Sequence, residues 1–154
     1  MNKKSKVASV LNIITSLIAG GVFGYVSYVL IVFLSIGIEQ ADTSAQRAEL
    51  IVRGVALALP AVLSLVNFVM SIISFKYLGR GAERYSKGFN IAMFVVEFVA
   101  ACSYVVFATM MFESIPLLIG SCVAGILFAL FGFVHLSDFL KSKKAQIVSE
   151  PVQE

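Results

Sequence analysis

The sequence predicts an all-α integral membrane protein, a four-helix bundle whose N- and C-termini are both cytoplasmic. The chain of 154 residues is 59% hydrophobic and only 14% charged, whereas about a quarter of the residues in a soluble domain are charged. It contains four apolar runs, each meeting the length of about 20 residues that a helix needs to cross the hydrocarbon core of a bilayer. Its basic residues also gather on one side of the predicted membrane, which sets the orientation of the helices.

The four apolar runs account for most of the chain. The predicted spans are residues 7–37, 54–75, 89–112 and 117–137. They form one transmembrane domain, residues 7–140, between a basic N-terminal tail (1–6) and a polar C-terminal tail (141–154) that we expect to be disordered. Little sequence remains outside these segments, so we expect no soluble catalytic module.

The first predicted span is longer than a membrane crossing requires. About 30 residues at 1.5 Å each extend roughly 45 Å, so this helix must tilt or project from the bilayer. The apolar run also exceeds the roughly 7–15 residues of a signal-peptide core, which predicts a retained helix. Asn12, Ser16 and Gly20 share one face, and Gly20 with Gly24 has the GxxxG spacing that allows close helix packing.

The second predicted span follows a short polar loop, residues 38–50, in which Asp42 or Thr43 could cap a helix. Pro60 lies inside this span and is expected to bend it. Ser64, Asn67, Ser71 and Ser74 recur at steps of three and four and form one polar stripe. The loop after the span is basic, and we expect its side chains to contact anionic lipid headgroups. These residues are Lys76, Arg80, Arg84 and Lys87.

The third and fourth predicted spans form a hairpin closed by a tight turn, with Pro116 at the start of the last helix. Glu97 and Tyr104 lie on one face of the third span. The fourth span has a stripe of small and polar residues suited to helix packing. These are Ser121, Gly125 and Gly132, with His135 at the end of the stripe.

The distribution of basic residues predicts the topology. Three lysines precede the first span, four basic residues follow the second and three lysines follow the fourth, so 10 of the 12 basic residues lie on one side. Only Arg47 and Arg53 fall on the other side. Because Lys and Arg in short loops remain in the cytoplasm, both termini are predicted to be cytoplasmic.

Four polar residues occur at similar depths in the four spans. Counted from the cytoplasmic ends, Asn12, Asn67, Glu97 and His135 lie roughly 9–15 Å into the membrane at 1.5 Å per residue. If the polar stripes face one another, these side chains form an intramembrane cluster, to which Tyr104 would contribute from the face of Glu97.

Glu97 is the residue that most needs an explanation, because a charged carboxylate deep in a bilayer costs several kcal/mol. Desolvation could keep it protonated. It could instead be hydrogen-bonded to Asn67 or paired with His135, or it could face water. A structural role in setting helix register, a functional role in proton or cation coupling, and a polar contact to a partner protein's helix all stay open.

Several kinds of chemistry are not indicated by the residues present. A single histidine cannot build a His-rich metal site, and the His135–Asp138 pair offers too few ligands for a closed one. Cys102 and Cys122 lie within apolar runs and are expected to be reduced, packed thiols. We found no catalytic or phosphate-binding motif. We therefore expect no enzyme activity, no metal, no cofactor and no nucleic-acid partner.

Two functions fit these residues. The first is a non-enzymatic membrane protein that acts through helix–helix interaction, as an accessory subunit of a membrane-protein partner or as a homo-oligomer. The alternative is a small proton-coupled transporter or permeation protein, dimeric, with Glu97 as the coupling acid. The short chain and lysine-rich start favour a bacterial plasma membrane.

Overall fold

The computed structural model describes residues 3–78 and 86–149, and these form four helices and no strand. The helices are α1 (Lys3–Gln40), α2 (Ser44–Leu78), α3 (Ser86–Met110) and α4 (Ile115–Ser149). The predicted all-α class is confirmed. All four helices are long and apolar enough to cross a membrane, so the chain is a small multi-pass membrane protein.

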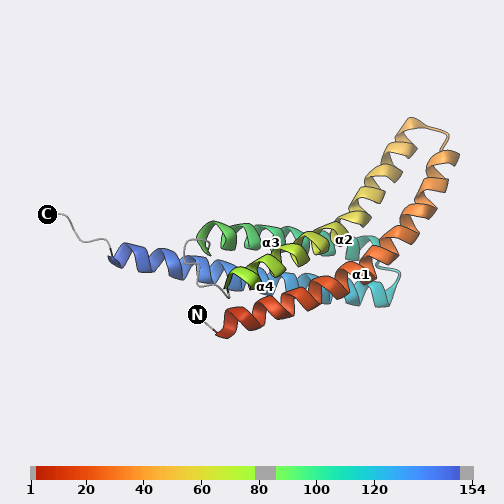
Figure 1. The fold of residues 1–154 in the computed structure, drawn as a ribbon. Coiled ribbons are helices and arrows are strands. Elements are labelled where there is room, and N and C mark those ends of the chain that lie inside the picture. The colour runs from red at the N-terminus through yellow and green to blue at the C-terminus, as the bar shows by residue number, and fades with distance from the viewer. Residues whose placement is uncertain (1–2, 79–85, 150–154) are drawn as a thin grey trace.

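The helices pack as two antiparallel hairpins, α1 with α2 and α3 with α4 (Figure 1). The hairpins meet mainly through α2 and α3, with a smaller contact between α1 and α4. Helix α1 begins and α4 ends at the same end of the bundle (Figure 1). We call this the terminal end, and the opposite end, where α3 turns into α4, the distal end.

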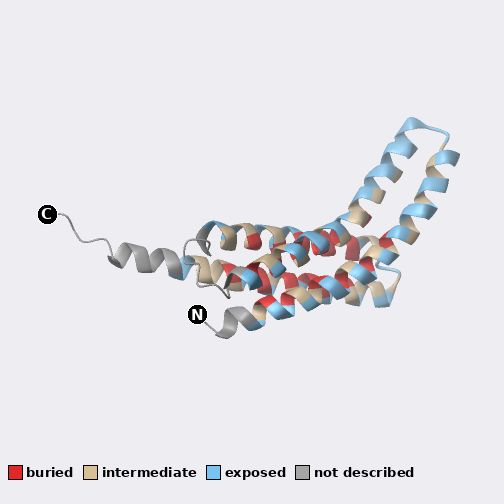
Figure 2. Ribbon diagram, viewed as in Figure 1, coloured by how far each residue is buried: buried red, intermediate tan, exposed pale blue. Residues whose placement is uncertain are grey.

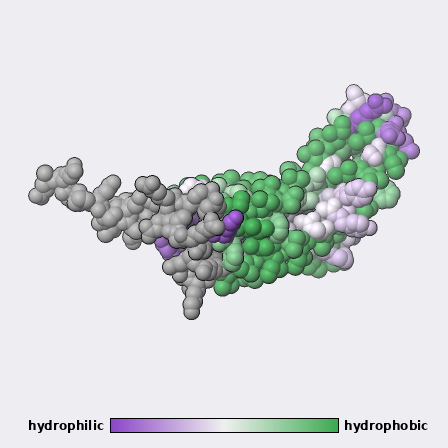
Figure 3. Space-filling view, in the orientation of Figure 1, coloured by the Kyte–Doolittle hydropathy of each residue, from purple (hydrophilic) through white to green (hydrophobic). Residues whose placement is uncertain are grey.

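The bundle is apolar outside and partly polar inside. Large hydrophobic side chains are exposed along all four helices, and they cover the central surface seen in Figure 3. The buried side chains line the surfaces where the helices face one another (Figure 2). They include serines, asparagines, a glutamate and a histidine, the arrangement expected when lipid replaces water outside the protein.

Most helix ends lie beyond the ends of the predicted spans. Helix α2 begins ten residues before the predicted position 54 because Thr43 and Gln46 cap it. The Thr43 hydroxyl accepts from the Gln46 N–H at 3.2 Å, and the Gln46 side-chain oxygen accepts from the Thr43 N–H at 3.2 Å. This reciprocal pair is a capping box. Helix α3 ends at Met110 rather than at residue 112.

Helix α4 continues to Ser149, whereas disorder was expected from residue 141. The added segment, KSKKAQIVS, carries lysine, alanine and glutamine, which favour helices.

The two cysteines also differ from expectation. The prediction of packed thiols was wrong, since Cys102 and Cys122 are free and exposed on the outer surface of the helices. Because a free thiol behaves as a small hydrophobic group, it is as compatible with a lipid-facing position as with a packed one.

The α1–α2 hairpin is longer than the bundle. Residues 29–56, which we call the distal arm, continue past the turn between α3 and α4 and leave the bundle axis at an angle (Figure 1). Pro60 lies in α2 at the base of the arm, where its ring interrupts the backbone hydrogen bonds of the helix. In the same region the Ser27 hydroxyl donates to the Leu57 carbonyl at 2.6 Å and holds α1 against α2.

The distal half of the bundle has an aromatic core. Phe23 of α1 makes edge contacts with the rings of Tyr104 and Phe107 of α3, at centroid distances of 4.8 and 5.3 Å. Tyr104 also stacks on Phe128 of α4 at 5.6 Å. All four rings are buried. This aromatic core separates the distal end from the polar interior described next.

Candidate functional site: a buried polar cluster in the terminal half

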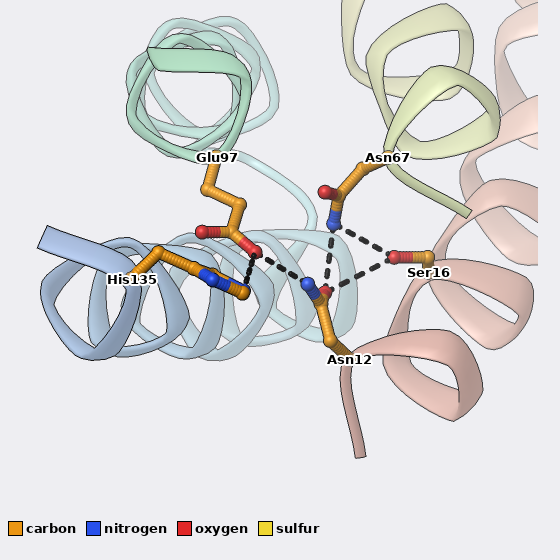
Figure 4. A network of polar contacts seen from close by, with 5 residues as sticks. All are labelled: Asn12, Ser16, Asn67, Glu97 and His135. Atoms are coloured by element: carbon orange, nitrogen blue, oxygen red, sulfur yellow. Dashed lines mark hydrogen bonds and ion pairs between the residues drawn. The ribbon is translucent and has the colours of Figure 1, made fainter. Parts of the chain in front are cut away.

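Every helix contributes a polar side chain to one buried cluster (Figure 4). Asn12 comes from α1, Asn67 from α2, Glu97 from α3 and His135 from α4, and each is at most 6% exposed. Ser16 joins from α1, one turn after Asn12. The prediction of similar depths therefore corresponds to direct contacts in the structure. We call these five residues the polar cluster.

The hydrogen bonds of the cluster form a chain from Asn67 through Asn12 to Glu97. Asn12 Nδ2 donates to Glu97 Oε1 at 2.5 Å, and Asn67 Nδ2 donates to Asn12 Oδ1 at 2.7 Å. The Ser16 hydroxyl donates to the same Asn12 oxygen at 3.3 Å and accepts from Asn67 Nδ2 at 2.9 Å. His135 Nε2 lies 3.5 Å from Glu97 Oε1. Glu97 thus contacts Asn12 and His135, and Asn67 reaches it only through Asn12.

The two amides of the cluster have defined orientations. Asn12 presents its NH₂ group to Glu97 and its oxygen to Asn67. Asn67 then presents its own NH₂ group. The cluster therefore compensates a buried carboxyl group with donors from two other helices.

Three buried side-chain atoms have no hydrogen-bond partner among the described residues: Glu97 Oε2, Asn67 Oδ1 and Ser71 Oγ. The backbone of Gly132 lies beside Glu97, where an added Cβ would be 3.7 Å from Oε2 and 3.5 Å from the Glu97 Cβ. Gly132 therefore lets α4 approach the carboxyl group closely without covering it. Buried polar atoms are otherwise nearly always paired.

Tyr104 was predicted to belong to this cluster, but its hydroxyl bonds elsewhere. It lies seven residues beyond Glu97 towards the distal end, and its oxygen pairs with the Ser64 hydroxyl at 2.7 Å. Its ring belongs to the aromatic core. Sequence reasoning placed Tyr104 on the face of Glu97, but two helical turns separate them by about 10 Å along the axis.

Ser16 was not among the predicted cluster residues, although it was recognised on the face of Asn12. The signal was its position four residues after Asn12, which places both side chains on one helix face. Ser71 lies likewise four residues from Asn67. The periodic pattern contained both serines, but it could not show which of them reach a partner.

The predicted helix-packing residues contact helices of the same chain. A Cβ at Gly20 would lie 3.5 Å from Ser64, and one at Gly24 would lie 3.9 Å from Ala61. A Cβ at Gly125 would lie 3.4 Å from the Cβ of Tyr104. Gly132 faces Glu97, and the Ser121 hydroxyl donates to the Leu117 carbonyl in its own helix at 2.6 Å. Each of these glycines thus lets two helices of one chain approach.

The residues predicted to contact lipid headgroups are only partly described. Lys76 is exposed in the last turn of α2. Lys87 lies in the first turn of α3. Arg80 and Arg84 fall outside the described residues.

Within residues 3–78 and 86–149, no group of three or more His, Cys, Asp or Glu side chains could hold a metal ion.

No protein-family model matches the chain, and no curated protein or solved structure is significantly similar to it. The function must therefore be argued from the geometry alone.

Proposed function

We propose that this chain is a small non-enzymatic membrane protein that acts through helix–helix interaction, as a self-assembling protein or as an accessory subunit of another membrane protein. The proposal places it in a bacterial plasma membrane with both termini cytoplasmic, where exposed Lys76 and the basic loop after it meet anionic lipid. The observation that carries the proposal is the distal arm.

The hairpin that carries the arm is longer than the hydrocarbon core of a bilayer. The apolar part of α3, Gly88–Met110, has 23 residues and spans about 34 Å, close to the thickness of the hydrocarbon core. The apolar part of α1, Val7–Gln40, has 34 residues and spans about 51 Å. Tyr25 and Tyr28 are strongly exposed at the base of the arm, and tyrosine favours the membrane interface. This supports an arm that projects beyond the hydrocarbon core.

The sides of the arm are nevertheless apolar. A Cβ at Gly37 would lie 3.5 Å from Leu50, and one at Gly54 would lie 3.8 Å from Leu34, so the two helices of the arm cover only their facing sides. Seven large hydrophobic side chains remain exposed on the arm: Ile31, Val32, Phe33, Ile36, Ile51, Val52 and Val55. A contiguous apolar surface of this kind outside the hydrocarbon marks an interaction site.

The tip of the arm is polar. The hydrophilic residues gather at the end of the arm in Figure 3, and Glu49 and Arg53 form an exposed ion pair at 2.6 Å further along α2. A polar tip is stable in water, whereas the apolar sides of the arm are more stable when another apolar surface buries them. A neighbouring helix provides that surface without burying the charges.

A shallow groove on the bundle adds a second surface for a partner helix. It has a volume of about 440 Å³ between α1 and α2, and Gly20, Gly21, Gly24 and Ala61 contribute to its lining. An added Cβ at Gly21 would meet nothing within 4 Å. Small residues on a lipid-facing surface allow another backbone to approach closely.

The proposal is tested by measuring assembly in native membranes and in lipid nanodiscs. We expect Phe33→Lys, on the apolar side of the arm, to reduce the assembled fraction at least fivefold. The matched control is Glu39→Lys, which introduces the same residue at the exposed tip of the same helix. Gly21→Leu should also weaken assembly if the groove contributes, whereas Gly88→Leu, at another open glycine, should not.

Single-molecule photobleaching counts the chains in each complex, and cross-linking in native membranes detects a different partner. A self-assembling protein gives oligomers of this chain, and an accessory subunit gives a mixed complex that contains it. A chain that is monomeric in both settings, with no effect of Phe33→Lys, would reject the proposal.

The second candidate function, proton-coupled transport by a dimer, is favoured by one observation. All four helices deliver a polar side chain to Glu97 or to its partner Asn12, so movement of any helix would change the surroundings of the acid. In vesicles, Glu97→Gln should abolish proton-driven uptake while leaving the protein folded. Unchanged uptake in this variant would remove Glu97 from such a mechanism.

A further inference from the structure

The polar cluster belongs to a longer column of buried polar side chains. From the terminal end, α1 contributes residues at steps of three and four, and α2 contributes a second set at similar steps. The residues that α1 and α2 contribute are at most 4% exposed. The column consists of Ser9, Asn12 and Ser16 of α1 and Asn67, Ser71 and Ser74 of α2, with Glu97 and His135 on its other side.

The column is closed at the distal side. Beyond Glu97 the next polar pair is Ser64 and Tyr104, whose hydroxyl groups satisfy each other at 2.7 Å. Phe23 and Phe128 pack against the Tyr104 ring, and Phe107 packs against Phe23. All three phenylalanines are at most 4% exposed. An apolar, close-packed layer of this kind excludes water.

The three unpartnered atoms lie along the column and not in the aromatic core. Ser71 lies about one turn nearer the terminal end than Asn67 on α2, and Glu97 lies at a depth similar to that of Asn67. A buried polar atom that is left without a hydrogen bond destabilises the fold. Buried water molecules typically satisfy such groups, because they make two to four bonds to polar atoms.

Glu97 faces few groups that could exchange a proton with it. His135 of α4 is the titratable residue in contact, and α1 and α2 face it with Asn12 and Asn67, which do not titrate. Asp138 lies three residues after His135 towards the terminal end of α4, on the same helix face. The polar route from Glu97 thus runs towards the terminal end.

We propose that water enters the bundle from the terminal end along this column, completes the hydrogen bonding of Ser71, Asn67 and Glu97, and lets Glu97 exchange protons with that side of the membrane only. The bound ligand is water, and the exchanged species is the proton. The inference does not rest on self-assembly of the arm, because it concerns the interior of a single bundle.

The first test measures access to the column with a membrane-impermeant methanethiosulfonate reagent. Cys102 and Cys122 are replaced by alanine, and a single cysteine is introduced as Ser71→Cys or Ser64→Cys. The two serines are a matched pair, since both are fully buried on α2 two turns apart. The side carrying the termini is identified in the same vesicles by protease removal of a C-terminal tag.

We expect Ser71→Cys to react at least tenfold faster than Ser64→Cys when the reagent is added to the side of the termini. Neither should react from the other side. Equal rates for the two variants, or faster labelling of Ser71→Cys from the opposite side, would overturn the proposal. Thermal unfolding of each variant shows whether the fold is retained.

The second test observes the wild-type side chain and therefore needs no new cysteine. In sealed proteoliposomes that hold the protein in one orientation, infrared difference spectra against Glu97→Gln isolate the bands of the Glu97 carboxyl group, and the pH is stepped on one side only. We expect these bands to change when the pH is stepped on the side of the termini. Bands that do not respond from that side, or respond equally from both, would contradict one-sided access.

Discussion

At the residue scale, the structure explains how an acid is tolerated in an apolar helix. The segment FVVEFVAACSYVVF would serve as a plain membrane helix apart from Glu97. Its carboxyl group accepts from Asn12 and lies beside His135, and Asn12 is oriented in turn by Asn67. The cost of burying the group is offset by donors from other helices, so each member of the cluster depends on the others.

This dependence predicts energetic coupling between Asn12 and Glu97. Asn12→Ala removes the donor to Glu97 Oε1 and should destabilise the protein by about 1–3 kcal/mol. In a Glu97→Ala background the same change should cost less, with a coupling energy of about 0.5–3 kcal/mol. The measurement is a double-mutant cycle of unfolding free energies in detergent micelles or bicelles.

The control pairs Asn12→Ala with Thr109→Ala. The Thr109 hydroxyl is exposed and donates to the Val106 carbonyl within its own helix. These two changes should be additive within about 0.5 kcal/mol. A cycle between Asn12 and Glu97 that is equally additive would mean that their hydrogen bond contributes nothing to stability.

The hydroxyl pair of Tyr104 and Ser64 should behave differently from the polar cluster. Tyr104→Phe keeps the stacking on Phe128 but leaves the Ser64 hydroxyl without its partner, so we expect a loss near 0.6 kcal/mol, typical of such bonds in membranes. Adding Ser64→Ala should cause little further loss, because removing both partners is nearly neutral. Thermal unfolding of the two single variants and the double variant tests this, and a double variant that loses the sum of both singles would refute it.

At the element scale, glycine determines how closely α3 and α4 approach. A Cβ at Gly125 would lie 3.4 Å from the Tyr104 Cβ and 3.5 Å from the Ala101 carbonyl oxygen. Alanine therefore fits only at the limit of contact, and any larger side chain must separate the two helices. Gly132 has the same role beside Glu97.

Gly125→Leu should therefore destabilise the bundle by about 1–3 kcal/mol or more through overpacking. Gly21→Leu is the control for the fold of a single chain, because an added Cβ there meets nothing within 4 Å. Unfolding of both variants under detergent conditions chosen to keep the protein monomeric gives the comparison. Similar stability of the two variants would show that α3 and α4 are not held at the distance described.

At the scale of the whole molecule, the chain combines a bundle of membrane thickness with an arm that exceeds it. The two termini leave at one end, and the arm leaves at the other (Figure 1). One-sided access to the column and interaction through the arm would thus operate on opposite sides of the membrane. The basic residues predict which side is cytoplasmic.

This orientation has a direct test. A reporter enzyme that is active only outside the cytoplasm should be inactive when fused after Glu154 and active when inserted between Asp42 and Thr43, at the tip of the arm. A fluorescent protein that matures only in the cytoplasm should show the reverse pattern. Activity of the first reporter at the C-terminus would reverse the assignment.

Sequence alone predicted the membrane class, the number of helices and four polar residues at one level of the helices. Apolar length and composition decide whether a helix suits lipid, and a constant rise per residue converts spacing into depth. Only the tertiary structure decided which polar groups touch. Asn12 rather than Asn67 donates to Glu97, and Tyr104 pairs with Ser64, because helix rotation and the glycine contacts of α4 select the partners. The distal arm likewise could not be predicted from the sequence of one helix. It exists because α1 and α2 continue past the turn between α3 and α4, and this depends on how the two hairpins are placed against each other.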